Sequence, residues 1–216
     1  MRGSSPRLSV SRETLLEGFF PTTQLKADRY AEILATWGIE RGLIGPREGE
    51  RIWDRHIANC IPITTIIPTQ ENPNKPEKAV TIVDIGSGAG LPGIVIALAR
   101  PDLEVTLIEP LQRRVDFLQE VIKELDLPIE VIRGKAESVK RSFDVVTARA
   151  VAPLPKLLPM SWHLVKQGGA LMAMKGESAQ QEIDETTPMP GSTTTLHTLE
   201  LPDFDPARVI EVKKPR

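Results

Sequence analysis

From residue 80 onward, the chain alternates short apolar runs with longer amphipathic segments. The apolar runs contain many β-branched residues and are typical of strands that are buried on both faces of a parallel sheet. We expect these strands at residues 80–85, 104–109, 130–133, 143–148 and 170–174. We expect helices between the strands at residues 94–99, 111–125 and 154–164. This alternation predicts right-handed crossovers between parallel strands.

Two further apolar runs follow the fifth strand. Residues 193–201 and 208–212 are separated by Pro202-Asp-Phe-Asp-Pro206, a segment typical of a turn, and we expect an antiparallel hairpin there. The pattern as a whole predicts an α/β fold with a seven-stranded, mostly parallel sheet.

The part of the chain before this sheet has the pattern of packed helices. A first helix at 13–20 should end before Pro21, and Thr22 or Thr23 can cap a second helix. The apolar face of the second helix consists of Ala27, Tyr30, Ala31, Leu34 and Trp37. We interpret this face as a packing surface, and Gly38 should end the helix.

The changes in pattern divide the chain into four parts. We expect a flexible tail at 1–12, a helical extension at 13–67, a polar and proline-rich linker at 68–79 and a main domain at 80–216.

A third helix, expected at 46–60, would carry a basic face. At 100° per residue, Arg47, Arg51 and Arg55 fall on one side of such a helix. The opposite side would bury Trp53, Ile57 and Cys60. By itself, the basic side is more often a solvated surface, here partly neutralised by Glu48, Glu50 and Asp54, than a local contact for nucleic acid. His56 lies between the two sides, where a structural histidine is more common than a catalytic one.

The first strand leads into a glycine-rich loop, Asp84-Ile-Gly-Ser-Gly-Ala-Gly-Leu-Pro-Gly93. Gly86, Gly88 and Gly90 allow positive φ and let a ligand approach the backbone closely. Pro92 suits the start of the next helix. The loop therefore predicts a ligand at a helix N-terminus.

Two classes of nucleotide compete for this loop. Read from Gly88, the loop matches G-x-G-x-x-G, and Glu109 follows about 20 residues later, as in dinucleotide-binding proteins. In that fingerprint, however, the first glycine follows the strand directly, whereas here Asp84 precedes Gly86. A carboxylate beside the loop favours the cationic amino group of S-adenosylmethionine over a pyrophosphate.

Composition narrows the class of protein. The 216 residues are 40% hydrophobic and 26% charged, which fits one globular domain with a small extension. The net charge of −2 gives no general attraction to nucleic acid, so any RNA contact needs a local basic surface. The single cysteine, Cys60, excludes an intramolecular disulfide and a four-cysteine zinc site, and we expect a cytoplasmic protein without a metal. No apolar run has the length of a membrane span, and residues 1–12 lack a signal-peptide pattern, so we expect no membrane association.

Residues after the expected strands should gather at the carboxyl edge of the sheet, where ligands of such folds bind. Glu109 could bind both hydroxyls of a ribose, or be a solvated acid. Ala136 and Glu137 could address an adenine edge, although Glu137 also fits the first turn of a helix. Arg149 would face the substrate, or else pair with Glu109 or the acid before the glycine loop. Lys175 could contact a phosphate or be a surface lysine.

Several motifs together resemble one known family. They are Trp53-Asp-Arg-His-Ile-Ala-Asn-Cys60, Val83-Asp-Ile-Gly-Ser-Gly-Ala-Gly-Leu-Pro-Gly93, Arg100-Pro-Asp-Leu103, Leu107-Ile-Glu-Pro-Leu-Gln-Arg-Arg-Val-Asp-Phe-Leu118, Ala148-Arg-Ala-Val-Ala152 and Met174-Lys-Gly-Glu177. Over residues 25–213 the chain resembles the ribosomal RNA small subunit methyltransferase G family, also called glucose-inhibited division protein B. Many members have aspartate where this chain has Asn59, and the variant here resembles the actinobacterial branch.

The resemblance implies a Rossmann-like class I methyltransferase that depends on S-adenosylmethionine and methylates N7 of one guanine in 16S ribosomal RNA. The family's cofactor residues correspond to Gly86, Leu91, Ala136, Glu137 and Arg149. With the residues singled out above, the expected cofactor site is Asp84, Gly86, Ser87, Gly88, Leu91, Glu109, Ala136, Glu137 and Arg149. The expected RNA contacts are Arg47, Arg51, Arg55, His56 and Lys175.

The residues agree with N7 as the methylated atom. N7 carries a free lone pair and no proton, so the reaction needs alignment rather than a general base, and we see no conspicuous base. Arg149 can address the adjacent N7 and O6 acceptors, and we expect it to position the guanine or the cofactor. Methylation of another RNA, a protein or a small molecule stays open, as do an RNA-binding module without activity and, more distantly, an NAD-dependent oxidoreductase. We expect a monomer that acts on 16S ribosomal RNA or on the small subunit.

Overall fold

The computed structural model describes residues 11–69 and 79–216. The expected tail at 1–12 and the expected linker at 68–79 fall largely outside these residues, and both stay predictions. Among the residues that are described, none of the helices combines the length and the apolar character that crossing a membrane requires.

Seven strands form one mixed sheet in the order β3-β2-β1-β4-β5-β7-β6. The strands are β1 (Thr81–Ile85), β2 (Glu104–Glu109), β3 (Glu130–Arg133), β4 (Phe143–Arg149), β5 (Val165–Lys175), β6 (Thr193–Leu199) and β7 (Ala207–Lys213). The strands from β1 to β5 pair in parallel, and β7 is antiparallel to both β5 and β6. The predicted seven-stranded, mostly parallel α/β sheet is therefore confirmed. The strand order reverses between β1 and β4, so their carboxyl ends mark the ligand-binding edge.

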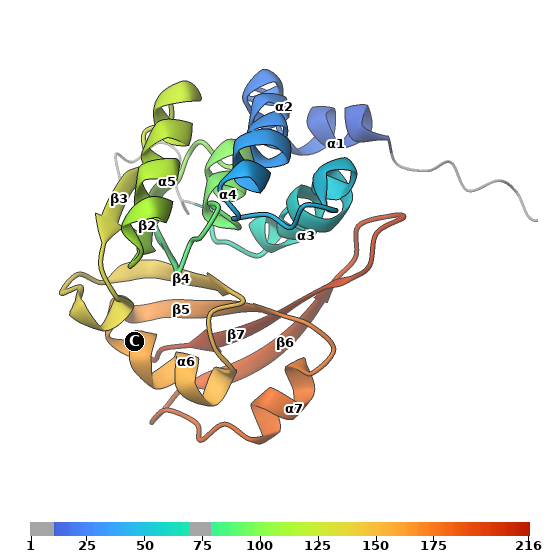
Figure 1. The fold of residues 1–216 in the computed structure, drawn as a ribbon. Coiled ribbons are helices and arrows are strands. Elements are labelled where there is room, and N and C mark those ends of the chain that lie inside the picture. The colour runs from blue at the N-terminus through green and yellow to red at the C-terminus, as the bar shows by residue number, and fades with distance from the viewer. Residues whose placement is uncertain (1–10, 70–78) are drawn as a thin grey trace, which may run out of the picture.

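Helices cover both faces of the sheet (Figure 1). The α-helices are α1 (Arg12–Phe19), α2 (Gln24–Ile33), α3 (Ala58–Cys60), α4 (Gly93–Ala99), α5 (Gln112–Glu124), α6 (Leu154–Ser161) and α7 (Ala179–Asp184). Helices α1 to α5 share one hydrophobic cluster with one face of the sheet, and α6 and α7 share a second cluster with the other face. Neighbouring strand residues belong to opposite clusters, as Ile82 and Val83 do, because side chains alternate along a strand.

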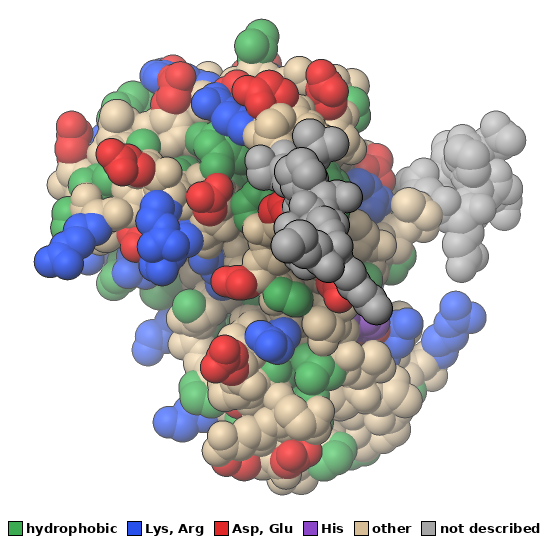
Figure 2. Space-filling view, turned by 90° about the vertical axis from the view of Figure 1, so that its right-hand side faces the viewer, with side chains coloured by type: hydrophobic (Ala, Val, Ile, Leu, Met, Phe, Trp, Pro, Cys, Tyr) green, Lys and Arg blue, Asp and Glu red, His purple; other side chains and the backbone are tan. Residues whose placement is uncertain are grey.

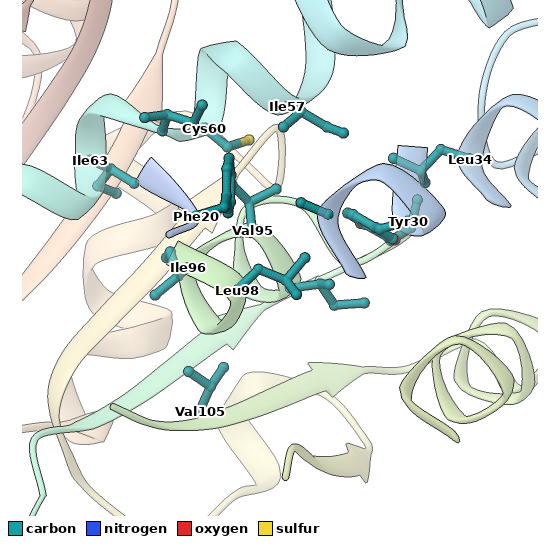
Figure 3. Packing of buried hydrophobic residues seen from close by; sticks show 14 of the residues in the cluster. Phe20, Tyr30, Leu34, Ile57, Cys60, Ile63, Val95, Ile96, Leu98 and Val105 are labelled. Carbon is teal, nitrogen blue, oxygen red and sulfur yellow. The ribbon is translucent and has the colours of Figure 1, made fainter. Parts of the chain in front are cut away.

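The N-terminal extension is a layer of the main core and packs directly on α4 (Figure 3). Phe20, Tyr30 and Cys60 from the extension are fully buried near Val95 and Leu98 of α4. A fully buried side chain of the larger apolar kinds contributes about 1.5–3 kcal/mol relative to an exposed one. The extension and the sheet therefore stabilise each other.

Two expected helices of the extension are corrected by the structure. The third is not one helix over 46–60, but a series of short turns: the 3₁₀-helix η2 (Gly49–Arg51), the π-helix η3 (Ile52–Ile57) and α3. The second helix changes after α2 into another π-helix, η1 (Leu34–Gly38). Because a π-turn contains more residues than an α-turn, the 100° rule fails here. The three arginines do not form a single helix face, and Arg47 lies in the turn before η2.

Smaller corrections concern the later elements. The fifth strand, expected at 170–174, spans Val165–Lys175 and includes Gly168 and Gly169. The register between β4 and β5 shifts near Phe143, and a Cβ on Gly169 would lie 2.5 Å from the Asp144 carbonyl, so this position requires glycine. Helix α7 was not expected at all. The remaining short 3₁₀-helices are η4 (Pro62–Thr65), η5 (Ala136–Ser138) and η6 (Trp162–Leu164).

Candidate functional site

The glycine loop, residues 86–92, joins β1 to α4 at the carboxyl edge of the sheet. Gly86, Gly88 and Gly90 have φ angles of +65°, +58° and +94°, as their sequence pattern predicted. A Cβ on Gly86 would lie 2.8 Å from Val151, and a Cβ on Gly90 would collide with Ile94. A Cβ on Gly88 would meet no atom closer than 3.8 Å. Packing explains the first and third glycines, and Gly88 leaves space for a ligand.

Asp84 lies beneath the glycine loop rather than beside it. Its side chain is fully buried and accepts hydrogen bonds from the Thr147 hydroxyl at 2.9 Å and the Gly93 N–H at 3.3 Å. Burial raises the pKa of this carboxyl to about 7, against the opposing effect of these hydrogen bonds and of Arg149. The expectation that Asp84 faces a cationic ligand group is thus corrected, because the carboxylate is enclosed by β4 and the start of α4. Sequence reasoning missed Thr147.

Glu109, at the end of β2, holds the glycine loop from the other side. Its side chain is 1% exposed and accepts hydrogen bonds from the N–H groups of Gly88 and Leu111, each at 3.0 Å. The guanidinium of Arg114 lies 3.8 Å away. Each carboxylate oxygen can accept a second hydrogen bond. The expected binding of ribose hydroxyls therefore stays a prediction, but the alternative of a solvated acid is wrong.

The other expected cofactor residues border the same edge. Ser87 is buried and its hydroxyl donates to the Asp84 carbonyl, while Leu91 is half-buried. Ala136 is buried at the start of η5, and Glu137 is exposed in the first turn of that short helix. Their contact with an adenine ring stays a prediction.

Arg149 connects the end of β4 to the N-terminal extension. Its guanidinium donates to the Arg55 carbonyl at 3.4 Å, to the His56 carbonyl at 3.5 Å and to the Cys60 sulfur at 3.1 Å. The structural pairing that the sequence suggested, with Glu109 or Asp84, is absent among the described ion pairs. The next residue, Ala150, has a φ of +54°, which is strained for a residue with a Cβ. Strain at a strand end beside a pocket is typical of a functional site.

Two pockets meet at Arg149 and Asn59. The larger, which we call the β4–β5 pocket, has a volume of about 580 Å³ and is lined by Asn59, Arg149, Ala150, Val151, Ala152, Pro153, Met174, Lys175, Gly176 and Glu182. The smaller, the extension pocket, has a volume of about 320 Å³ and is lined by Glu48, Asp54, Arg55, His56, Asn59, Arg149, Phe204 and Asp205. Val151 joins the larger pocket to the glycine loop, because it lies against Gly86.

The expected RNA-contacting residues of the extension differ in their exposure. Arg47, Arg51 and Arg55 are exposed, and Arg55 also pairs with Glu48 at 3.2 Å. His56 is half-buried, and burial together with the charge of Arg149 lowers its pKa. The carboxylate of Glu48, 3.4 Å from the imidazole, opposes this lowering of the pKa, and the net shift favours the neutral imidazole.

Lys175 does not offer its charge to a phosphate. Its ammonium is 2.8 Å from Glu182 and donates to the Ala152 carbonyl at 2.6 Å, and its side chain is 10% exposed. Glu182 lies on α7, the helix that the sequence pattern did not predict. The expected phosphate contact is corrected to a buried ion pair that holds the wall of the β4–β5 pocket.

Comparison with known proteins identifies the family. A family model described as rRNA small subunit methyltransferase G matches residues 23–201. Two proteins named ribosomal RNA small subunit methyltransferase G are similar to this chain. The protein from Thermobifida fusca is 51% identical, and the match covers 77% of this chain and 68% of the relative. The protein from a Nocardioides species is 48% identical, and the match covers 83% of this chain and 72% of the relative. The solved structure of a predicted O-methyltransferase from Agrobacterium tumefaciens shares the fold, with a TM-score of 0.54 and 20% identity over 73% of this chain and 81% of that one. The chain therefore belongs to the rRNA small subunit methyltransferase G family, a family of S-adenosylmethionine-dependent methyltransferases.

Proposed function

We propose that this protein methylates N7 of one guanine in the 16S RNA of the small ribosomal subunit. The observation that carries the proposal is the family match over residues 23–201, which includes both the glycine loop and Arg149. The order of the strands supports it, because the loop, Glu109 and Arg149 meet where a sheet of this type binds its ligand.

The residues around the loop fit S-adenosylmethionine, which supplies a methyl group on a positively charged sulfur. Gly88 leaves open space above the backbone. The buried Glu109 carboxylate accepts from the Gly88 N–H of the loop, and the buried Asp84 carboxyl accepts from the Gly93 N–H at the start of α4. We propose that Glu109 binds the ribose with its remaining acceptor positions, and that Leu91 and the segment 136–137 border the adenine. The Glu109 carboxylate beside the loop also favours a cationic ligand over a pyrophosphate.

For the guanine, we propose the β4–β5 pocket. N7 attack needs no proton transfer, so the pocket has to align the base and exclude water rather than supply a general base. Arg149 and Asn59 lie where the two pockets meet, and their N–H groups can address the N7 and O6 edge or the phosphate beside it. Because Arg149 is held by carbonyl groups of the extension, its position depends on the packing of that layer.

For the RNA backbone, we propose the exposed arginines of the extension, Arg47, Arg51 and Arg55, with His56 at the entrance of the extension pocket. Figure 2 shows one side of the molecule, on which basic and acidic side chains are mixed. Such a surface provides local phosphate contacts without a strong overall field, in agreement with the net charge of −2.

We also propose a cytoplasmic monomer. In the described residues, only Leu25 and Leu111 are large apolar side chains with high exposure, so the part of the surface that these residues form shows no broad apolar patch for a second copy. Sedimentation of the purified protein should give one species near 23.9 kDa.

The decisive experiment maps the methylated atom. The protein is incubated with S-adenosylmethionine and either naked 16S ribosomal RNA or intact small subunits. Reduction followed by aniline should then cleave the RNA at a single guanine, because N7 methylation labilises that base. A Gly88→Val variant, which fills the open side of the loop, is the inactive control. A label on an exocyclic amine, a ribose hydroxyl or a protein would refute the proposal, and cleavage only after treatment of subunits would assign recognition to the assembled particle.

A further inference from the structure

Tyr30 links the N-terminal extension to the glycine loop. It lies on α2, is fully buried, and its hydroxyl donates to the Ala89 carbonyl at 2.8 Å (Figure 3 shows its place beside α4). The apolar face of α2 would accept phenylalanine here as well as tyrosine. The hydroxyl is therefore the part of this side chain that packing alone does not require.

The bond from Tyr30 completes the fixation of one peptide group. The carbonyl of the Ala89–Gly90 peptide accepts from Tyr30, and its N–H donates to the Ser87 carbonyl at 2.7 Å. A peptide group that precedes a glycine rotates readily as a unit, since glycine accepts both signs of φ. Gly90 is in the left-handed region at +94°, and a Cβ on it would lie 3.0 Å from the Tyr30 oxygen. The loop therefore needs glycine at this position, and glycine leaves the peptide free unless something holds it.

The neighbouring peptide groups of the loop are held by the sheet instead. The Gly86 N–H donates to the Ile108 carbonyl at 2.8 Å, and the Gly88 N–H donates to Glu109. The Ala89 carbonyl is thus the point at which the loop is positioned by the extension. Burial raises the pKa of Tyr30 well above its ordinary value, so the hydroxyl is protonated and can donate at neutral pH.

We propose that Tyr30 is a positioning residue for S-adenosylmethionine: its hydroxyl keeps the Ala89–Gly90 peptide in the orientation that the cofactor binds. The side chain acts through the loop, and the inference rests on the proposed function only for the identity of the ligand. Without the hydroxyl, the loop divides its population among several peptide orientations, and the apparent affinity falls in proportion to the competent fraction. The reaction of the bound complex is unaffected, because the cofactor selects the same loop orientation.

The test is a Tyr30→Phe variant with a matched control. Calorimetry with S-adenosylhomocysteine should show binding about 3- to 10-fold weaker, as expected for the loss of one hydrogen bond. The KM for S-adenosylmethionine should rise by the same factor, with kcat at saturation unchanged. The control, Thr23→Val, removes a hydroxyl that donates to the Leu98 carbonyl at 2.6 Å, at the far end of α4. It should lower stability without changing the affinity.

Three results would overturn the inference. Unchanged affinity of Tyr30→Phe would show that the loop does not need the hydroxyl, and equal weakening in Thr23→Val would show general loosening of the extension. Hydrogen exchange of the wild-type protein decides the case if Tyr30→Phe does not fold. The Gly90 amide should be protected from exchange before ligand is added. If it exchanges freely and slows only with S-adenosylhomocysteine, the peptide is not held in its binding orientation in the free protein, and the inference is wrong. Failure of the wild type to bind S-adenosylhomocysteine would instead refute the proposed function.

Discussion

Replacement of Asp84 by asparagine should remove a strong pH dependence from the stability of the protein. The carboxyl group is buried beneath the glycine loop, and burial raises its pKa to about 7 from the ordinary value of 3.8. The folded protein therefore binds this proton more tightly than the unfolded chain. It follows that the free energy of unfolding of the wild type falls as the pH rises from about 4 to about 7.

The size of the effect follows from the two pKa values of Asp84. Their difference is about 3 pH units, and at about 1.4 kcal/mol per unit the ionised carboxylate destabilises the fold by about 4 kcal/mol at pH 8. About half of this loss is present near pH 5.5. An asparagine amide can replace the carboxylate. Its oxygen accepts from the Gly93 N–H, and its nitrogen donates to the Thr147 hydroxyl. That hydroxyl can then donate to the Val83 carbonyl, which lies 3.5 Å away.

Urea unfolding of both proteins across this pH range measures the difference directly. Between pH 4 and pH 8, the free energy of unfolding of Asp84→Asn should rise by about 3–4 kcal/mol relative to that of the wild type. Asp144→Asn is the control with the opposite sign. Burial tends to raise the pKa of Asp144, but its ion pair with Lys166 at 2.8 Å and the hydrogen bonds from Thr81 lower it. The ionised Asp144 therefore stabilises the folded protein above pH 3.8, and this stabilisation is lost as the pH falls further. A pH-independent difference for Asp84→Asn would refute the assignment of a buried, proton-binding carboxyl.

Three further predictions concern the loop, the extension and the RNA. Gly88→Ala should fold, since its Cβ meets no atom closer than 3.8 Å, but should bind S-adenosylhomocysteine about tenfold more weakly or worse in calorimetry; normal binding would place the ligand elsewhere. Arg149→Lys should lower the unfolding free energy by about 1–3 kcal/mol and expose the extension to protease, because one ammonium cannot replace a guanidinium that spans three acceptors. Alanine at Arg51 and Arg55 should reduce the log–log salt slope of RNA binding by about 0.7–0.9 for each lost phosphate contact, and alanine at the ion-paired Lys175 should leave the slope unchanged.

The sequence by itself determined the sheet and the glycine loop. The bounds of β2 and β3 match the prediction, because a short run of β-branched residues between polar segments has few alternatives to a buried strand. The signs of φ at the three loop glycines were also predictable, since a repeated glycine is favoured where the backbone must enter the left-handed region. The motifs around these elements were sufficient to identify the family.

Tertiary structure alone decided which partners the site residues have. Arg149, Lys175 and Tyr30 each donate a hydrogen bond to a residue at least 23 positions away in the chain: to the Cys60 sulfur, the Ala152 carbonyl and the Ala89 carbonyl, respectively. A sequence pattern shows which face of an element is buried, but not which carbonyl lies opposite a given donor.

The helices of the extension show the same limit in their backbone. Their sequence has α-helical periodicity, yet η1 and η3 are π-helices, so the arginines of 47–55 do not share the face that a 3.6-residue repeat predicts. With this backbone, Ile57 and Cys60 belong to the hydrophobic cluster that includes α4, and the carbonyls of Arg55 and His56 accept hydrogen bonds from Arg149. This choice depends on burial against another layer, whose free energy outweighs the local preference for the α-turn.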